Sequence, residues 1–210
     1  MLFVSHCLLN ENVRYLGGAT RPGAVVEVVR TALEEGVGLV QMPCPEQRAW
    51  GGVLKTRMLE AYGRAWLARH GGARRRVARA VTVWTRLAVA PLARRVAADV
   101  ADYRRSGMTV VGIVGVGASP SCGVTCTIDL PAALGTLASC PLAELTAEGV
   151  NRRVVIANTA PGTGLFTDAL RAALRRRHLA VPFFEHDLIA ELRGEARLPE
   201  GLPQALRRRT

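Results

Sequence analysis

The feature that most constrains the fold is a set of short, unbroken apolar segments separated by segments with helical signals. The apolar segments lie at residues 2–5, 37–42, 108–117, 153–157 and 180–184. Strands covered by helices on both faces are continuously apolar rather than alternating. The pattern therefore predicts an α/β fold: a single doubly wound domain with a mostly parallel, Rossmann-like sheet.

Helical periodicity fills the intervals between these strands. In residues 25–33, apolar side chains recur on one helix face, with Pro22 suited to its start and Gly36 to its end. Residues 74–105 are expected to form one or two helices broken at Pro91, because proline lacks an amide hydrogen. Other helices are expected at residues 56–69, 141–148, 165–177 and 187–193.

Composition limits the class of protein. With 49% hydrophobic and 21% charged residues, the chain has enough apolar surface for a core, which excludes a disordered protein. The domain is expected to span residues 1–194, and residues 195–210 to form a basic tail that adds little core. No apolar run is long enough for a membrane span, and no basic stretch precedes the first apolar residues. We expect a cytoplasmic protein with reduced thiols and no membrane association.

The net charge of +11 comes almost entirely from arginine, since Lys55 is the only lysine. The basic clusters are scattered along the chain and include residues 74–76, 175–177 and 207–209. They are consistent with a polyanionic partner such as tRNA. They are also consistent with solvated helix faces and a GC-rich coding bias, which is the interpretation that we favour. The charge permits a nucleic-acid partner without requiring one.

Three of the five cysteines follow predicted strands. Cys7, Cys44 and Cys122 come after the first, second and third strands, in loops rich in serine, proline or glycine. Because the carboxyl ends of parallel strands meet at one edge of the sheet, the three thiols are expected to lie together there. They form either a shared metal site, an iron–sulfur cluster or zinc, or three unrelated core thiols. Cys126 is a fourth ligand or a spare thiol, and Cys140, at the expected helix start, is structural.

Short motifs around these cysteines resemble the thiouracil desulfidase (TudS) family. They are Val4–Leu9, Val13–Tyr15, Cys44–Glu46 with the following Gly51-Gly52, and Ser119–Gly123. Gly162–Gly164 and Val181-Pro182 are similar to the C-terminal part of the family, so the resemblance spans about residues 2 to 190. His6, Asn10 and residues 47–50 and 64–105 depart from the family pattern. The chain resembles a divergent branch.

The resemblance implies a [4Fe–4S] cluster held by Cys7, Cys44 and Cys122, with one iron open to substrate. On this basis the thiocarbonyl of a substrate becomes a carbonyl and hydrogen sulfide is released, without net redox change. Glu46 matches the general base, and its alternative role is a helix-start carboxylate or an arginine partner. Ser119 matches a catalytic serine that relays a proton or orients substrate, and its alternative role is a turn residue.

Three further residues are expected to bind the substrate: Arg14, Tyr15 and Ser121. Arg14 and Tyr15 suit hydrogen bonding to and stacking on a pyrimidine, or else anchoring of the first loop. Gly162–Gly164 precedes a helix and suits either an anion site or close packing of a loop on the sheet. The leading hypothesis is a desulfidase acting on a free thiolated nucleobase or related thioamide. The alternatives are a desulfidase for thiouridine in tRNA and a non-catalytic cluster- or zinc-binding protein.

Overall fold

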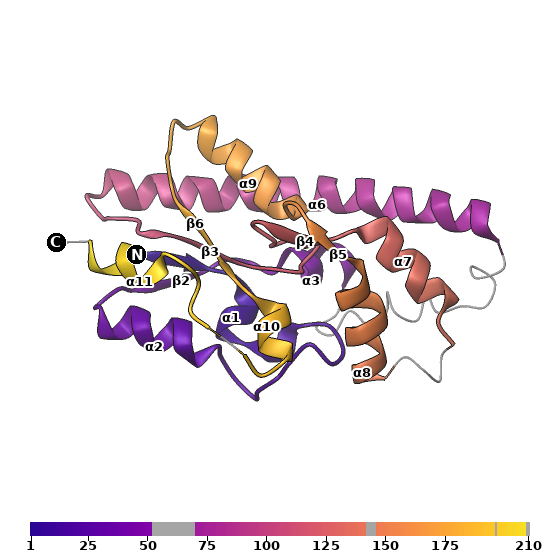
Figure 1. The fold of residues 1–210 in the computed structure, drawn as a ribbon. Coiled ribbons are helices and arrows are strands. Elements are labelled where there is room, and N and C mark those ends of the chain that lie inside the picture. The colour runs from indigo at the N-terminus through magenta and orange to yellow at the C-terminus, as the bar shows by residue number, and fades with distance from the viewer. Residues whose placement is uncertain (52–69, 142–145, 196, 209–210) are drawn as a thin grey trace.

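A four-stranded parallel sheet forms the centre of the computed structural model, which describes residues 1–51, 70–141, 146–195 and 197–208 (Figure 1). In β1, Val4 pairs with Gln41 on one side and Val114 on the other, so the carboxyl ends of these strands share one edge. The predicted α/β class with a mostly parallel sheet is confirmed. The strand order is β2-β1-β3-β6, with β1 at Leu2–Val4, β2 at Leu39–Gln41, β3 at Gly112–Val116 and β6 at Phe183–His186.

Helices cover both faces of this sheet (Figure 1). Phe3 packs in the apolar cluster formed with α6 and α9, whereas Leu2 and Val4 pack in the cluster on the opposite face. This division follows from the strand geometry, since successive side chains point to opposite faces. The first face carries α6 (Gly71–Arg105) and α9 (Leu165–Arg175), and the second carries α2 (Val26–Glu34), α10 (Leu188–Leu192) and α11 (Leu202–Arg207).

The remaining elements surround the carboxyl edge of the sheet. The strand pair β4–β5 and the helix α7 have no counterpart in the predicted elements. Asp129 caps α7 by accepting a hydrogen bond from the amide of Ala132 (3.0 Å). The elements around the carboxyl edge include α1 (His6–Leu9), η1 (Glu11–Val13), α3 (Pro45–Trp50), α7 (Leu130–Ser139), α8 (Ala147–Gly149), and the antiparallel strands β4 (Cys126–Ile128) and β5 (Thr159–Pro161).

The expected break at Pro91 is wrong, because α6 continues through this residue without interruption. A proline inside a helix removes one hydrogen bond and costs about 3 kcal/mol. On either side of Pro91, Val89 and Ala93 are fully buried in the cluster that α6 shares with α9 and the sheet. Burial of this helix face offsets the missing bond, so tertiary packing decides the outcome.

The strand expected at residues 153–157 is also wrong. Residues Val150–Val155 form a π-helical segment, η3, and Ile156–Asn158 form a 3₁₀ turn, η4. Val150 and Val154 bury their side chains against α7 rather than in the sheet. A short apolar run does not distinguish a buried strand from a buried helical turn. The strand expected at 180–184 exists, shifted to Phe183–His186 as β6.

The C-terminal tail contributes to the core, contrary to expectation. Leu202 and Leu206 of α11 are buried against the second face of the sheet. The helices expected at residues 25–33, 165–177 and 187–193 are confirmed as α2, α9 and α10. The helix expected at 56–69 lies outside the described residues, as do residues 142–145 of the one expected at 141–148. No described helix is both long and apolar enough to cross a membrane.

Candidate functional site

One cavity at the carboxyl edge of the sheet collects the three cysteines that follow strands. Cys7 lies in α1, Cys44 precedes α3 and Cys122 lies in the loop after β3. All three line a cavity of about 60 Å³, here called the cysteine cavity. The expected meeting of these loops at one edge is therefore observed. Its wall also includes Ser5, Arg14, Tyr15, Glu46, Ser119, Pro120 and Ile128.

The cysteine cavity brings its ionisable groups close to one another. Burial raises the pKa of the Cys122 thiol well above its ordinary value, and the neighbouring charges of Cys7 and Glu46 raise it further. At Cys44, the sulfur accepts a hydrogen bond from the amide of Gln47 (3.4 Å). The three thiols thus share one wall with the carboxyl group of Glu46.

Glu46 and Ser119 form a hydrogen-bonded pair on the cavity wall. The Ser119 hydroxyl donates to Glu46 Oε1 (3.0 Å), and its oxygen accepts from the amides of Ser121 (3.2 Å) and Cys122 (3.0 Å). Ser119 is therefore a turn residue for the Cys122 loop and also a partner of Glu46. The turn role considered for Ser119 is thus confirmed, and its catalytic role stays a prediction.

Glu185 of β6 anchors the continuation of the Cys122 loop. Its Oε2 accepts hydrogen bonds from the amides of Val124 (2.6 Å), Thr125 (2.8 Å) and Cys126 (3.1 Å). Sequence analysis missed this residue, whose one signal was a carboxylate directly after the predicted apolar strand at 180–184. Because three amides converge on one carboxylate, the loop geometry depends on the register of β6.

The glycine-rich segment Gly162–Gly164 packs against the same loop. A Cβ atom at Gly164 would overlap the carbonyl group of Ser121, so only glycine fits there without movement. The amide of Gly164 donates to the carbonyl of Gly123 (3.0 Å). Of the two roles considered for this segment, the contacts support close packing of backbone on backbone.

A buried ion-pair network holds the first loop next to the cavity. The Arg14 guanidinium donates to both carboxylate oxygens of Glu191 (2.6 and 3.1 Å) and to the carbonyl of Gly18 (3.0 Å). His186 and Thr20 also bond to Glu191. Burial by itself would raise the pKa of Glu191, but its hydrogen bonds with His186 and Arg14 hold it well below the ordinary value. Sequence analysis missed Glu191.

The three expected substrate-binding residues have different positions. Arg14 and Tyr15 line the cysteine cavity, whereas Ser121 is completely buried outside its wall. The Tyr15 hydroxyl donates to Asn151 Oδ1 (2.7 Å), and burial raises its pKa. The Ser121 carbonyl accepts from the amides of Phe166 (3.0 Å) and Thr167 (3.1 Å), so Ser121 ties the loop to α9.

The other two cysteines lie away from this cavity. Cys126 begins β4 and pairs with Pro161, and it is absent from the cavity wall. Cys140 is the C-cap residue of α7, and residues 142–145 of the helix expected after it lie outside the described residues. Within the described ranges, no three His, Cys, Asp or Glu side chains are grouped so as to hold a single metal ion.

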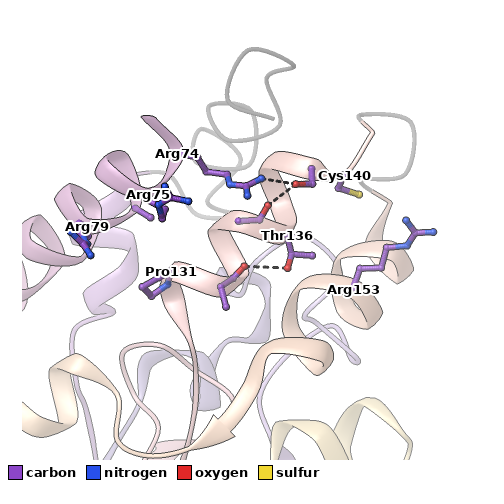
Figure 2. Close-up of a pocket in the computed structure, with 11 residues that line it drawn as sticks. Arg74, Arg75, Arg79, Pro131, Thr136, Cys140 and Arg153 are labelled. Carbon is purple, nitrogen blue, oxygen red and sulfur yellow. Dashed lines mark hydrogen bonds between the residues drawn. The ribbon is translucent and has the colours of Figure 1, made fainter. Parts of the chain in front are cut away.

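A second, larger hollow lies between α6 and α7 (Figure 2). This arginine groove has a volume of about 910 Å³ and is lined by Arg74, Arg75, Arg79 and Arg153. Arg74 donates to Ser139 on α7 (2.9 Å), while Arg75 and Arg79 are exposed on α6. The described residues that line the groove include no acidic side chain. The groove is therefore strongly basic and open.

Comparison with known proteins adds no assignment to these two regions. No family model, no curated protein and no solved structure matches this chain significantly. Function must therefore be inferred from the residues of the cavity and the groove themselves.

Proposed function

We propose that this chain is an iron–sulfur-cluster-dependent desulfidase, which converts the thiocarbonyl of a thiolated nucleobase or related thioamide into a carbonyl. The supporting observation is that Cys7, Cys44 and Cys122 line one cavity together with the Glu46–Ser119 pair. The proposal includes a doubly wound, Rossmann-like domain whose cluster site lies at the carboxyl edge of the strands.

The residues of the cysteine cavity fit such a cofactor. Three thiols are the soft ligands that iron–sulfur clusters prefer, and each would bind a different iron, so they need to surround a cavity rather than a point. Arg14 Nε is buried without a hydrogen-bond partner in the described part of the chain, and Arg14 lines this cavity. When bound by three cysteines, a [4Fe–4S] cluster supplies one open iron as a Lewis acid for the substrate sulfur.

The protein side chains supply the proton transfers. Glu46 accepts a proton from water as the water oxygen forms a bond to the thiocarbonyl carbon. The carbon–sulfur bond then breaks, and the sulfur leaves as hydrogen sulfide with both protons of the water. Water thus provides the carbonyl oxygen and the hydrogens, so the reaction consumes no oxidant or reductant. Ser119, by donating to Glu46 Oε1, orients the carboxylate and is a positioning residue.

Replacement of Glu46 tests the proposal most directly. Anaerobically reconstituted protein is expected to be brown and to release hydrogen sulfide from 2-thiouracil. Glu46→Gln keeps the size and the acceptor for Ser119 but cannot take a proton, so turnover should fall by about 10²-fold or more. The cluster spectrum and iron content should stay the same, and exposed Glu34→Gln serves as the control. Unchanged turnover, or loss of the cluster in Glu46→Gln, would contradict the assigned role.

A second candidate keeps this chemistry but takes thiouridine in tRNA as the substrate. The arginine groove favours it, since its described lining contains four arginines and no acidic side chain, which suits a phosphate backbone. The discriminating measurement is tRNA binding over a range of salt concentrations. A steep loss of affinity with salt supports tRNA, and no complex at low salt excludes it. A colourless, zinc-loaded protein without activity would instead support the non-catalytic alternative.

A further inference from the structure

An apolar chamber lies directly beside the cysteine cavity. Its volume is about 90 Å³. Two of the residues that form it, Leu134 and Leu137, are buried on α7. The apolar residues that line it include Trp50, Leu130, Leu134, Leu137, Val154 and Val155.

The chamber and the cysteine cavity share part of their walls. Tyr15, Glu46, Pro120 and Ile128 line both spaces. A molecule that is in contact with Glu46 in the cysteine cavity is therefore next to the chamber as well. The chamber is the natural place for the part of a substrate that does not react.

Two polar groups at the edge of the chamber, those of Tyr15 and Trp50, are bonded to residues outside it. The Tyr15 hydroxyl donates to Asn151 (2.7 Å), and Trp50 Nε1 donates to Thr85 Oγ1 (2.8 Å). Neither Asn151 nor Thr85 lines the chamber. A hydroxyl or phosphate group placed among the leucine and valine side chains, away from Glu46 on the shared wall, would lose its water without gaining a partner, which is unfavourable. A hydrocarbon group has no such cost and gains from burial.

We propose that the substrate carries a short alkyl substituent that occupies this chamber while its thiocarbonyl lies in the cysteine cavity. This inference rests on the proposed desulfidase function and narrows its substrate class to alkyl-substituted thioamides. The size follows from comparison with a dry apolar cavity of about 150 Å³, which holds benzene. A chamber of about 90 Å³ suits a short alkyl chain rather than an aromatic ring. A tRNA nucleoside, with a polar ribose, would leave it empty.

Binding of oxygen-containing analogues tests this inference without turnover. Reconstituted protein is titrated calorimetrically with uracil, 5-propyluracil and 6-propyluracil. Each buried CH₂ group improves affinity about fourfold, so one propyl isomer should bind on the order of 50-fold more tightly than uracil. If neither isomer binds more tightly than uracil, the inference is wrong.

Two substitutions at one chamber position sharpen the test. Leu134→Phe fills the chamber and should bring the propyl-to-uracil affinity ratio close to one. Leu134→Ala enlarges it and should extend the gain to a phenyl-substituted analogue. Gly135→Ala, on the same helix but outside the chamber wall, should leave the ratio unchanged. An unchanged ratio in both Leu134 variants, with normal thermal melting, would overturn the proposal.

Turnover separates this inference from the function on which it rests. With reconstituted protein, 6-propyl-2-thiouracil and 2-thiouracil are compared for hydrogen sulfide release. If both react equally well, with the same KM, the desulfidase function stands and the chamber proposal fails. If neither reacts although propyluracil binds tightly, the chamber is a binding site and the desulfidase function fails. Preferential reaction of thiouridine in tRNA would contradict the alkyl substrate.

Discussion

The cysteine cavity and the arginine groove are built in opposite ways. The cavity takes Cys7, Cys44 and Cys122 from three loops that are far apart in the sequence, and buried contacts fix those loops. The groove is an open space between two helices, lined by arginines of which Arg75 and Arg79 are exposed. Residues around the cavity depend on many distant partners, and those around the groove on few. Substitutions should therefore be costly at the cavity and mild at the groove.

The largest difference is expected for the cysteines themselves. Replacing Cys7, Cys44 or Cys122 by alanine should remove most of the iron and the visible absorption, because a three-ligand cluster has no spare protein ligand. Cys140→Ala, at the arginine groove, should retain both. The iron content and the visible absorption of each variant are measured after anaerobic purification. A Cys44→Ala protein with full iron content, or a Cys126→Ala protein without iron, would overturn the ligand assignment.

The next effect concerns the ion-pair network behind the cavity. Glu191→Gln removes the nearer of the two buried carboxylates that pair with Arg14, the other being Glu11 (3.3 Å), and should lower the free energy of unfolding at pH 7 by about 1.5–3 kcal/mol. Since the pKa of Glu191 is lower in the folded than in the unfolded protein, its contribution is complete above its ordinary value of 4.5 and is lost as the pH falls below it. Urea unfolding between pH 7 and 3 should therefore show a flatter pH dependence for Glu191→Gln than for wild type.

A matched control for that substitution is Glu148→Gln. Glu148 forms an exposed pair with Arg152 (3.6 Å), and such surface pairs contribute little to stability. The free energy of unfolding of the Glu148→Gln protein should stay close to that of wild type at each pH. Equal losses in the two variants would mean that the buried network has no special role.

Two glycines give a smaller, directly paired contrast. Gly164→Ala forces a methyl group against the Ser121 carbonyl and should destabilise the protein by about 1–3 kcal/mol, with weaker cluster retention. Gly135→Ala, at the arginine groove, meets no atom and lies within α7, where alanine is favoured over glycine by about 0.5–1 kcal/mol. Thermal and urea unfolding should show shifts of opposite sign. Shifts of the same sign would contradict the close packing at Gly164.

The smallest effect is expected at the groove arginines. Arg75→Ala and Arg79→Ala should each change the free energy of unfolding by less than about 0.5 kcal/mol, because both side chains are exposed. If the groove binds tRNA, each substitution should also reduce the slope of log affinity against log salt by about one. A loss above 1 kcal/mol in either variant would show that the groove is as constrained as the cavity.

The sequence by itself determined the parallel sheet and the convergence of three cysteine loops. Local apolar runs specify buried strands, and once strands are parallel, the loops after their carboxyl ends must share an edge. The positions of Cys7, Cys44 and Cys122 on one wall follow from that rule. The sequence pattern predicted the type and the boundaries of elements outside the sheet less accurately. Residues 153–157 have the composition of a strand yet form helical turns against α7.

Only the tertiary structure decided which side chains support the cavity. Glu191 lies 177 positions from Arg14 and Glu185 lies 60 positions from Thr125, so neither pairing has a local sequence signal. The apolar chamber likewise exists only because α3, α7 and η3 approach one another. A sequence pattern reports the period of one element and its burial, whereas the partner of a buried charge depends on packing between elements distant in the chain.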